Sequence, residues 1–549
     1  VTRIKETDRH HTMFDFFSQR TPAQKQPQFF VPKADPFENP LVETDPHALA
    51  QWATALPFAN PQQLAENVIT SLSRLNRYPG QVKKRDELMQ IYITPAMRLA
   101  HGMSQRKQQA PISLVRRVML EMAYGYCHIV NHCISSKQSK KSAQKLGQAI
   151  YNASKYFILE YLLACEDFDC RCVSPYQHLS RLMTYAWEQN LHLLEMEDHD
   201  QSESHQATIS HQYNRFLLLL LLDPCHLQEG EPRICFDYLN ELAGEANIIA
   251  PDKDVDATGR YVIDRLGEVP PYLYHPDCLE NLPLPRFTLF DLSPVSKTLH
   301  QQLRLMEKSE QSKPACMNRL TAKEANNLLA RMLKSWHIRL KRDSERHNTS
   351  GQIMVWIGVQ NAYQYLAGQS ANQEPGDEEI TMTQPVGMRD SAHRVGNKRI
   401  IALRSNQSRS GVALRIPRQA VSKELIGQLI LISTHENKQG SDWKLGVVKR
   451  AMNSGDNLLE VGVQFVAGKL EPITLRLAKL QNEEESNPDH GAIFIDQGHN
   501  NRSSLIVPKH FFVIGQEYRV EEMIPSPSIS PLQQLETTAH FERFRIKSV

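Results

Sequence analysis

Two short motifs, Arg342-Asp-Ser-Glu-Arg346 and Asn406-Gln-Ser-Arg-Ser-Gly411, decide how the second half of the chain is interpreted. The first places two guanidinium groups four residues apart. Each group is a planar fork of donors that matches phosphate oxygens or the O6/N7 edge of guanine. The second motif predicts a tight turn between two strands, because Asn406 and Ser408 can hydrogen-bond nearby backbone and Gly411 permits positive φ.

The residues around the two motifs point the same way. Arg339 and Lys341 extend the first motif, and we expect them to act as auxiliary contacts. After the second motif, three apolar stretches predict strands: Gly411-Val-Ala-Leu-Arg415, Trp443-Lys-Leu-Gly-Val-Val-Lys-Arg450 and Leu459-Glu-Val-Gly-Val-Gln-Phe465. Basic residues outnumber acidic ones between Arg331 and Arg415, which suits an anionic ligand but is also common on solvated surfaces.

Together the motifs resemble RxxxR and (D/N)xSxxG, the two signatures of the PilZ domain family. In that family they clasp the bacterial second messenger cyclic di-GMP. The resemblance covers roughly residues 339–478, and Leu459 to Phe465 looks like the closing part of a PilZ barrel. It implies a PilZ-like antiparallel β-barrel of six strands over 336–478. It also implies ligand contacts from Arg342, Arg346, Asn406, Ser408 and Gly411, with Arg339 and Lys341 beside them.

The spacing of the motifs departs from the family pattern, since about sixty residues separate Arg346 from Asn406. The excess lies in 369–397, a polar stretch without periodicity that we interpret as an insertion after a first strand. Such insertions are tolerated because the cost of closing a loop grows slowly with its length. A rival pair, Arg389 with Arg394, has the wrong spacing and lies too near Asn406.

The rest of the chain predicts an α+β multidomain protein. Given the usual size of a domain, 549 residues are enough for about three of them. Residues 1–45 have the composition of a mostly disordered lead. Its phenylalanines could dock on the body or on a partner, or could equally pack only locally: Phe14, Phe16, Phe17, Phe29 and Phe30. A helical domain is expected over 46–335, with Asp45 and Asn60 as N-caps before proline. Its last helix, about 321–340, leads directly into the first motif. Residues 479–549 predict a small β module or barrel extension.

Composition bounds the cellular setting. The net charge is +2, and the longest apolar run, Phe216 to Leu222, is far shorter than the about 20 residues that span a bilayer. No apolar signal segment opens the sequence, so a cytoplasmic protein without a membrane span is expected. Nine scattered cysteines favour reduced thiols over a disulfide framework.

No residue pattern predicts catalysis or a metal centre. The chain has none of the common catalytic motifs GxSxG, GxxxxGK[ST] and HExxH. It also lacks a recognisable set of carboxylates that would make or cleave the dinucleotide. His128 and His132 lie one helical turn apart beside Cys127 and Cys133, but the spacing fits core residues better than a zinc site. Cys165, Cys170 and Cys172 likewise lack the spacing of a zinc finger.

These expectations combine into one function and two alternatives. The first is a cyclic di-GMP receptor that is not an enzyme, needs no cofactor and signals to a protein partner through its helical domain. The family's outputs include motility, pilus function and adhesion, and the sequence does not choose among them. The second is an interaction protein whose barrel no longer binds the messenger. The third, single-stranded nucleic-acid binding, would need aromatic residues interleaved with arginine on one sheet face, which the strands do not show.

Overall fold

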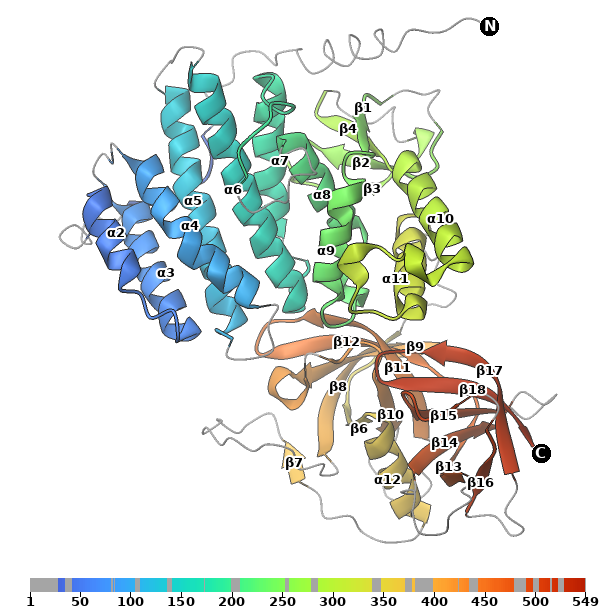
Figure 1. Ribbon diagram of the computed structural model, residues 1–549. Coiled ribbons are helices and arrows are strands. Elements are labelled where there is room, and N and C mark those ends of the chain that lie inside the picture. The colour runs from blue at the N-terminus through green and yellow to red at the C-terminus, as the bar shows by residue number, and fades with distance from the viewer. Residues whose placement is uncertain are drawn as a thin grey trace, which may run out of the picture. The chain divides into compact units, whose positions relative to one another are not determined.

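The protein forms two compact units in the computed structural model (Figure 1). The first contains Val1–Pro224 and Gly230–Leu340, and the second contains Cys225–Glu229 and Lys341–Val549. The structure describes residues 28–34, 42–79, 82, 84–103, 109–135, 141–171, 173–198, 208–251, 256–277, 285–337, 347–370, 378–380, 398–422, 424–433, 443–477, 490–496, 503–513, 516–521 and 528–548.

The first unit opens with a series of helices. They are α2 (Pro46–Thr54), α3 (Pro61–Arg77), α4 (Arg85–Gly102), α5 (Ile112–Ser135), α6 (Lys141–Glu166), α7 (Val173–Glu188), α8 (Ile209–Leu221) and α9 (Glu231–Leu242). The side chains of Asp45 and Asn60 accept hydrogen bonds from the backbone N–H groups of Ala48 and Gln63. The two predicted N-caps are therefore confirmed.

Apolar faces of these helices make the core of the first unit. Leu64, Val68, Leu72 and Leu75 are buried on α3, as their spacing of three and four residues predicts. The first four residues of the apolar run, Phe216 to Leu219, are buried within α8. In the part of the chain that the structure describes, no helix combines the length and apolar character needed to cross a bilayer.

A small antiparallel sheet completes the first unit, so the region 46–335 is not helical throughout. Its strands are β1 (Asn247–Ile249), β2 (Arg260–Asp264), β3 (Tyr272–Leu273) and β4 (Phe287–Asp291), in the order β1-β4-β2-β3. Two helices follow, α10 (Ser293–Lys308) and α11 (Ala322–His337). β1 and β3 are too short to show alternation, and β4 is buried at four consecutive positions and shows none.

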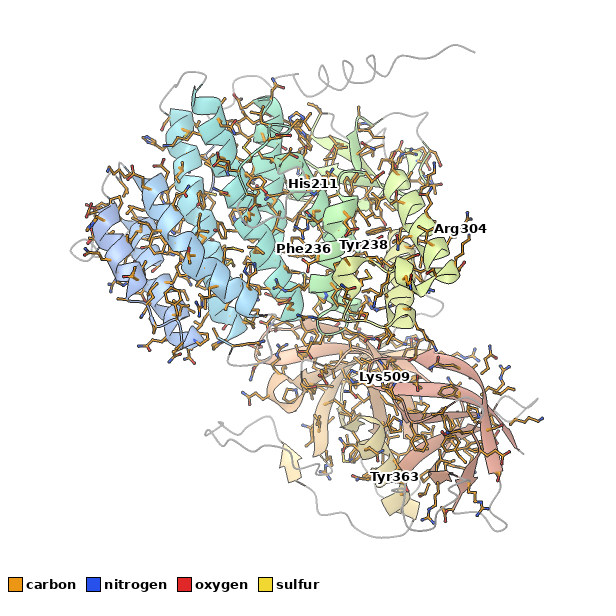
Figure 2. All side chains as sticks on the ribbon, viewed as in Figure 1. His211, Phe236, Tyr238, Arg304, Tyr363 and Lys509 are labelled. Atoms are coloured by element: carbon orange, nitrogen blue, oxygen red, sulfur yellow. The ribbon has the colours of Figure 1, made fainter. Side chains whose placement is uncertain are left out.

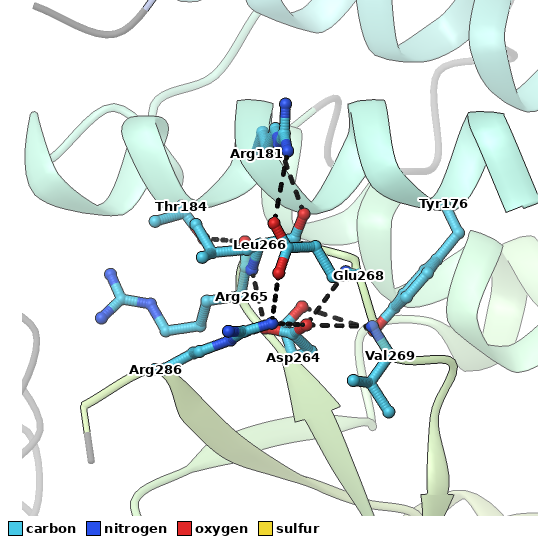
Figure 3. A network of polar contacts seen from close by, with 9 residues as sticks. All are labelled: Tyr176, Arg181, Thr184, Asp264, Arg265, Leu266, Glu268, Val269 and Arg286. Carbon is cyan, nitrogen blue, oxygen red and sulfur yellow. Dashed lines mark hydrogen bonds and ion pairs between the residues drawn. The ribbon is translucent and has the colours of Figure 1, made fainter. Parts of the chain in front are cut away.

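The turn after β2 is organised by a buried carboxylate, and α7 bonds to the backbone of the same turn (Figure 3). Asp264 accepts two hydrogen bonds from the guanidinium of Arg286, at 2.8 and 2.9 Å, and three more from backbone N–H groups of its own turn. From α7, Thr184 and Arg181 donate to carbonyl groups of the same turn. Burial alone would raise the pKa of Asp264, but these hydrogen bonds outweigh it and hold the pKa below 3.8.

The second unit starts with a ring of six strands, which contains both ends of the second motif. The strands are β6 (Gln352–Ile357), β8 (Lys398–Ser408), β9 (Gly411–Pro417), β10 (Leu429–Ser433), β11 (Trp443–Asn453) and β12 (Leu458–Phe465). They pair antiparallel in the order β8-β6-β10-β11-β12-β9, and β9 pairs again with β8. Two short strands, β5 (His347–Asn348) and β7 (Glu378–Ile380), add to β8.

A second closed barrel follows, where the sequence predicted only a small β module or extension. It consists of β13 (Lys469–Leu477), β14 (His490–Asp496), β15 (Ser504–Pro508), β16 (Tyr518–Val520), β17 (Ser528–Thr537) and β18 (Phe541–Ser548). Numbered one to six along the chain, the strands of both barrels pair as 1–2, 2–3, 3–6, 6–5, 5–4 and 4–1. The two barrels thus share one connectivity, although the β14–β15 connection carries no Asn-x-Ser-x-x-Gly motif.

The helix α12 (Val359–Ser370) and a shared apolar core join the two barrels. The core combines Trp356 and Leu431 of the first barrel with Ile493 and Phe541 of the second. Tyr363 of α12 (Figure 2) is within hydrogen-bonding distance of Thr474, with 2.7 Å between the two hydroxyl oxygens. A Cβ atom at Gly491 would lie 2.2 Å from the ring of Tyr363, so this position needs glycine.

Two elements differ from what the sequence predicted for this region. β13 lies inside the range 336–478 expected for the first barrel, but its partners are β14 and β16. After the strand β6 comes α12, a helix that the sequence interpretation missed, and it reaches into the predicted insertion 369–397. Within that insertion the structure describes β7, which pairs in parallel with the start of β8; the remaining residues 371–377 and 381–397 lie outside the described part.

Candidate functional site

The second motif forms the hairpin between β8 and β9, as predicted. Ser408 pairs with Gly411 across a two-residue turn, Arg409–Ser410, and both turn residues are exposed. The Ser408 hydroxyl donates to the carbonyl oxygen of Gly411 at 3.3 Å and lies 3.5 Å from the Ser410 hydroxyl. The hairpin therefore presents hydroxyl and backbone groups at one end of the barrel.

Gly411 is required by space and not by backbone conformation. The sequence suggested a positive φ at this position, but the φ angle of Gly411 is not positive. Instead, a Cβ atom at this position would lie 2.3 Å from the carbonyl oxygen of Val463 on β12. Its glycine character lets β9 approach β12, which fixes the edge of the barrel next to the hairpin.

A β-bulge aims the motif outward. Along β8, Ile400 and Ala402 are buried in the barrel, and Arg404 pairs with the buried Leu414. The register then shifts between Arg404 and Asn406, so that Ser405 is an extra residue. Because side chains alternate along a strand, this one residue moves Asn406 and Ser408 from the inner to the outer face.

The outer face beside Asn406 is a shallow floor of small residues. Asn406 pairs with Ala413 on β9, which pairs with Gly462 on β12, which in turn pairs with Arg450 on β11. Two positions with little or no side chain thus lie between an amide and a guanidinium. Ala413 is 3% exposed, so a flat ligand reaches this floor only when the side chains that cover it move aside.

Arginines that the sequence interpretation did not select surround this floor. Arg409 is exposed in the turn, and Arg415 is exposed on β9. Arg450 faces the floor and lies 3.5 Å from Glu460. The alternation of Val412, Leu414 and Ile416 would have placed Arg415 outside; the place of Arg450 depends on a second bulge and carries no such signal.

The first motif adjoins this face through the chain. Arg339, Lys341, Arg342 and Arg346 lie outside the described residues. His347 follows Arg346 directly, and β5 pairs His347 with Gln407 and Asn348 with Asn406. The described strand that continues the first motif is therefore the neighbour of the strand that carries the second.

The histidine and cysteine cluster of the first unit belongs to the helix core. His128 lies 2.8 Å from the carbonyl oxygen of Asn76, and burial lowers the pKa of its imidazole to about 4. Burial raises the pKa of the Cys127 thiol to about 12. Among the described residues no group of three or more His, Cys, Asp or Glu is arranged to hold a metal ion.

The sequence predicted reduced thiols, and this is wrong for at least two of the cysteines. Cys170 and Cys225 are disulfide-bonded. Free thiols are found at Cys127, Cys133, Cys165, Cys235 and Cys316. An odd number of scattered cysteines describes the chain as a whole and cannot exclude bonds at individual cysteines, which is why composition missed them.

Comparison with family models decides the relationship. A model described as "Cyclic-di-GMP receptor FimW, N-terminal domain" matches residues 47–252, and one described as "Cyclic-di-GMP receptor FimW, middle PilZ domain" matches 261–401. Together they cover more than half of the chain. The chain is a PilZ-family protein. Comparison with curated proteins gave no match.

The PilZ assignment confirms the resemblance and the fold class predicted from sequence: a helical amino-terminal region followed by antiparallel β-barrels. The amino-terminal match covers α2 to α9. The middle match starts in β2 and ends in β8, before Asn406. The limits that we expected for the domains, among them 46–335 and 336–478, therefore stay a prediction.

Proposed function

We propose that this protein binds cyclic di-GMP on the outer face of its first barrel. The proposed ligand residues are Arg342, Arg346, Asn406, Ser408 and Gly411, with Arg339 and Lys341 as auxiliaries. The observation that carries the proposal is the pairing of β5 with β8, since it makes the strand after Arg346 the neighbour of Asn406. Both matching family models are named after a cyclic-di-GMP receptor.

The chemistry of the face suits this ligand. Cyclic di-GMP carries two phosphates and two guanines, and arginine forks bind both groups. The floor of Ala413 and Gly462 accepts a flat base, and Asn406 and Ser408 add an amide and a hydroxyl at its edge. Exposed Arg409 and Arg415 make the surroundings favourable for an anion.

We also propose that the bound messenger signals to a protein partner through the first unit, without catalysis and in the cytoplasm. Clamping of the segment that contains Arg342 and Arg346 would restrict the helix that precedes it, which is a disorder-to-order switch. The main alternative is an interaction protein whose barrel binds no messenger. The second barrel supports that alternative, because it keeps the connectivity without the motif.

Calorimetry separates the two candidates. Wild-type protein should bind cyclic di-GMP but not GTP, cyclic di-AMP or an oligonucleotide. Arg342→Ala and Arg346→Ala should each lose about 1.5–3 kcal/mol of binding free energy, roughly ten- to more than a hundredfold in affinity. Lys at either position should rescue binding poorly, since a point charge cannot make a bidentate contact. Unchanged binding in both alanine variants would refute the proposed site.

A further inference from the structure

An extended segment near the amino terminus is held by the side chain of a single asparagine. The backbone N–H of Phe29 donates to Oδ1 of Asn131 on α5, and Nδ2 of Asn131 donates to the carbonyl oxygen of Phe29, both at 2.9 Å. The two residues are 102 positions apart in the sequence. One amide thus satisfies both polar groups of one backbone residue, which is the way that a peptide-binding surface reads an extended chain.

Aromatic rings supply the rest of the contact. The ring of Phe29 is 7% exposed and packs edge-on against Tyr185 of α7, with 5.7 Å between ring centroids. Phe30 lies against Tyr124 of α5, at 5.5 Å, and against His178 of α7, at 5.7 Å. The first phenylalanine is therefore an anchor, and the second covers an aromatic surface.

Phe30 completes a circuit of four rings. Tyr124 packs edge-on against Phe157 of α6, at 6.2 Å, and Phe157 stacks on His178, at 4.7 Å. Three helices thus provide three rings, and the amino-terminal segment provides the fourth. Burial lowers the pKa of His178 to about 4 and raises that of Tyr124 to about 12, so both rings are uncharged at physiological pH.

This arrangement recognises a pattern that a separate chain could also present. The asparagine contacts only backbone atoms, which every residue except proline offers in full. Specificity comes from the rings, which favour an aromatic residue at each of two consecutive positions. Phe30 is still 55% exposed, so its half of the contact is open to exchange.

We propose that the surface formed by Asn131, Tyr124, Phe157, His178 and Tyr185 is a docking site for an extended segment of a partner protein with two adjacent aromatic residues. The chain's own Phe29 and Phe30 occupy this site as a tethered ligand. A short tether supplies an effective concentration of about millimolar, so only a partner with additional contacts displaces it. The proposal concerns the first unit alone and does not rest on messenger binding.

The test uses the full chain and a synthetic peptide of residues 28–34, Gln-Phe-Phe-Val-Pro-Lys-Ala. A variant with Phe29→Ala and Phe30→Ala empties the site. Saturation-transfer NMR, which detects affinities down to millimolar, should show that this variant binds the peptide at least tenfold more tightly than wild type does. A peptide with both phenylalanines replaced by alanine should not bind.

A third substitution ties binding to the asparagine. Added to the emptied variant, Asn131→Ala should weaken peptide binding roughly 5- to 100-fold, as expected for two hydrogen bonds. Ser135→Ala, one helical turn further along α5 and exposed, is the matched control and should change nothing. Circular dichroism shows whether each variant keeps its fold.

Three results would overturn the proposal. The first is no peptide binding by the emptied variant while it keeps its fold. The second is equal binding with and without Asn131. The third is a wild-type dimer in light scattering that becomes a monomer on Phe29→Ala and Phe30→Ala, since the segment would then come from a second copy and not from a tether.

Discussion

Gly411 and Gly462 are two glycines on neighbouring strands that the structure uses for different purposes. At Gly411 a methyl group would meet a backbone oxygen 2.3 Å away. At Gly462 the nearest atom to an added methyl group is the Cβ of Arg450, at 3.4 Å, which is ordinary contact. The first glycine thus supports the barrel, and the second leaves space on its outer face.

This contrast gives a paired prediction. Gly411→Ala should lower the melting temperature clearly, because β9 must move away from β12. Gly462→Ala should leave the melting temperature nearly unchanged and weaken cyclic di-GMP binding, because the methyl group enters the proposed floor. Differential scanning calorimetry and titration calorimetry measure the two effects. Tight messenger binding by Gly462→Ala would place the ligand elsewhere.

Residue chemistry explains which parts of the site the sequence could predict. The hairpin that contains Asn406, Ser408 and Gly411 was predicted correctly, because such a turn needs these residue types within a few positions. The reason for Gly411 was wrong, since it depends on Val463, which lies on β12 and far away in sequence. Arg450 could not be found, because its direction depends on a bulge in β11.

At the scale of elements, the bulge at Ser405 decides the direction of the motif. Deleting Gln407 would let Ser405 pair with Ala413 and Asn406 with Val412, which turns the Asn406 side chain into the barrel while Ser408 still pairs with Gly411. We expect this deletion to abolish messenger binding and to destabilise the barrel by burying a polar side chain. Deleting Ser405 instead removes the bulge but leaves Asn406 opposite Ala413, so it is the control and should retain binding. Binding that survives the Gln407 deletion would show that the direction of Asn406 is irrelevant.

The turn held by Asp264 predicts a dependence on pH. Its folded pKa lies below the usual range of an aspartate, so its contribution to stability is complete above that range and is lost as the pH falls through the folded pKa. Asp264→Asn should lower the melting temperature at pH 7 and reduce the loss of stability between pH 5 and about 2. Asp277→Asn, at an exposed position, should match wild type. A parallel pH profile for Asp264→Asn would contradict this.

Elements were predictable where their signals are local. The caps at Asp45 and Asn60 and the apolar face of α3 depend on residues within two helical turns, and they were found. α12 was missed because it follows β6 after a single glycine and its polar residues resemble the insertion behind it. β13 was assigned to the wrong barrel. It follows β12 closely in the sequence, like the second strand of a hairpin, but it pairs with β14 and β16, which come later in the chain.

At the scale of the whole molecule, the order of elements predicts a relay. α11 is the last described helix before the first motif, and the chain between them is short. A ligand shifts an equilibrium between conformations only by its different affinity for them, and the short stretch of sequence from α11 to Arg342, which has no glycine or proline, is our proposed source of such a difference. We therefore expect cyclic di-GMP to lower hydrogen exchange around residues 330–350 and to change it in the helices before.

A spacer tests the relay without touching the ligand residues. Gly and Ser residues inserted between Leu340 and Lys341 should leave most of the messenger affinity but remove the exchange effect in α11 and earlier helices. A spacer of the same composition in the turn at Gly455, between β11 and β12, is the control. If saturating ligand leaves exchange in the first unit identical, the protein binds the messenger without this relay.

The core shared by the two barrels has a consequence for synthesis. Trp356, Leu429 and Leu431 are covered by Ile493, Ile506 and Phe541, which the ribosome adds much later. Until Phe541 has emerged, the wall of the first barrel around α12 is an apolar surface open to other chains. Chains that end early are therefore expected to aggregate or to recruit chaperones even when the first barrel is complete. The strand β18 thus closes the second barrel and, through Phe541, covers the core that it shares with the first.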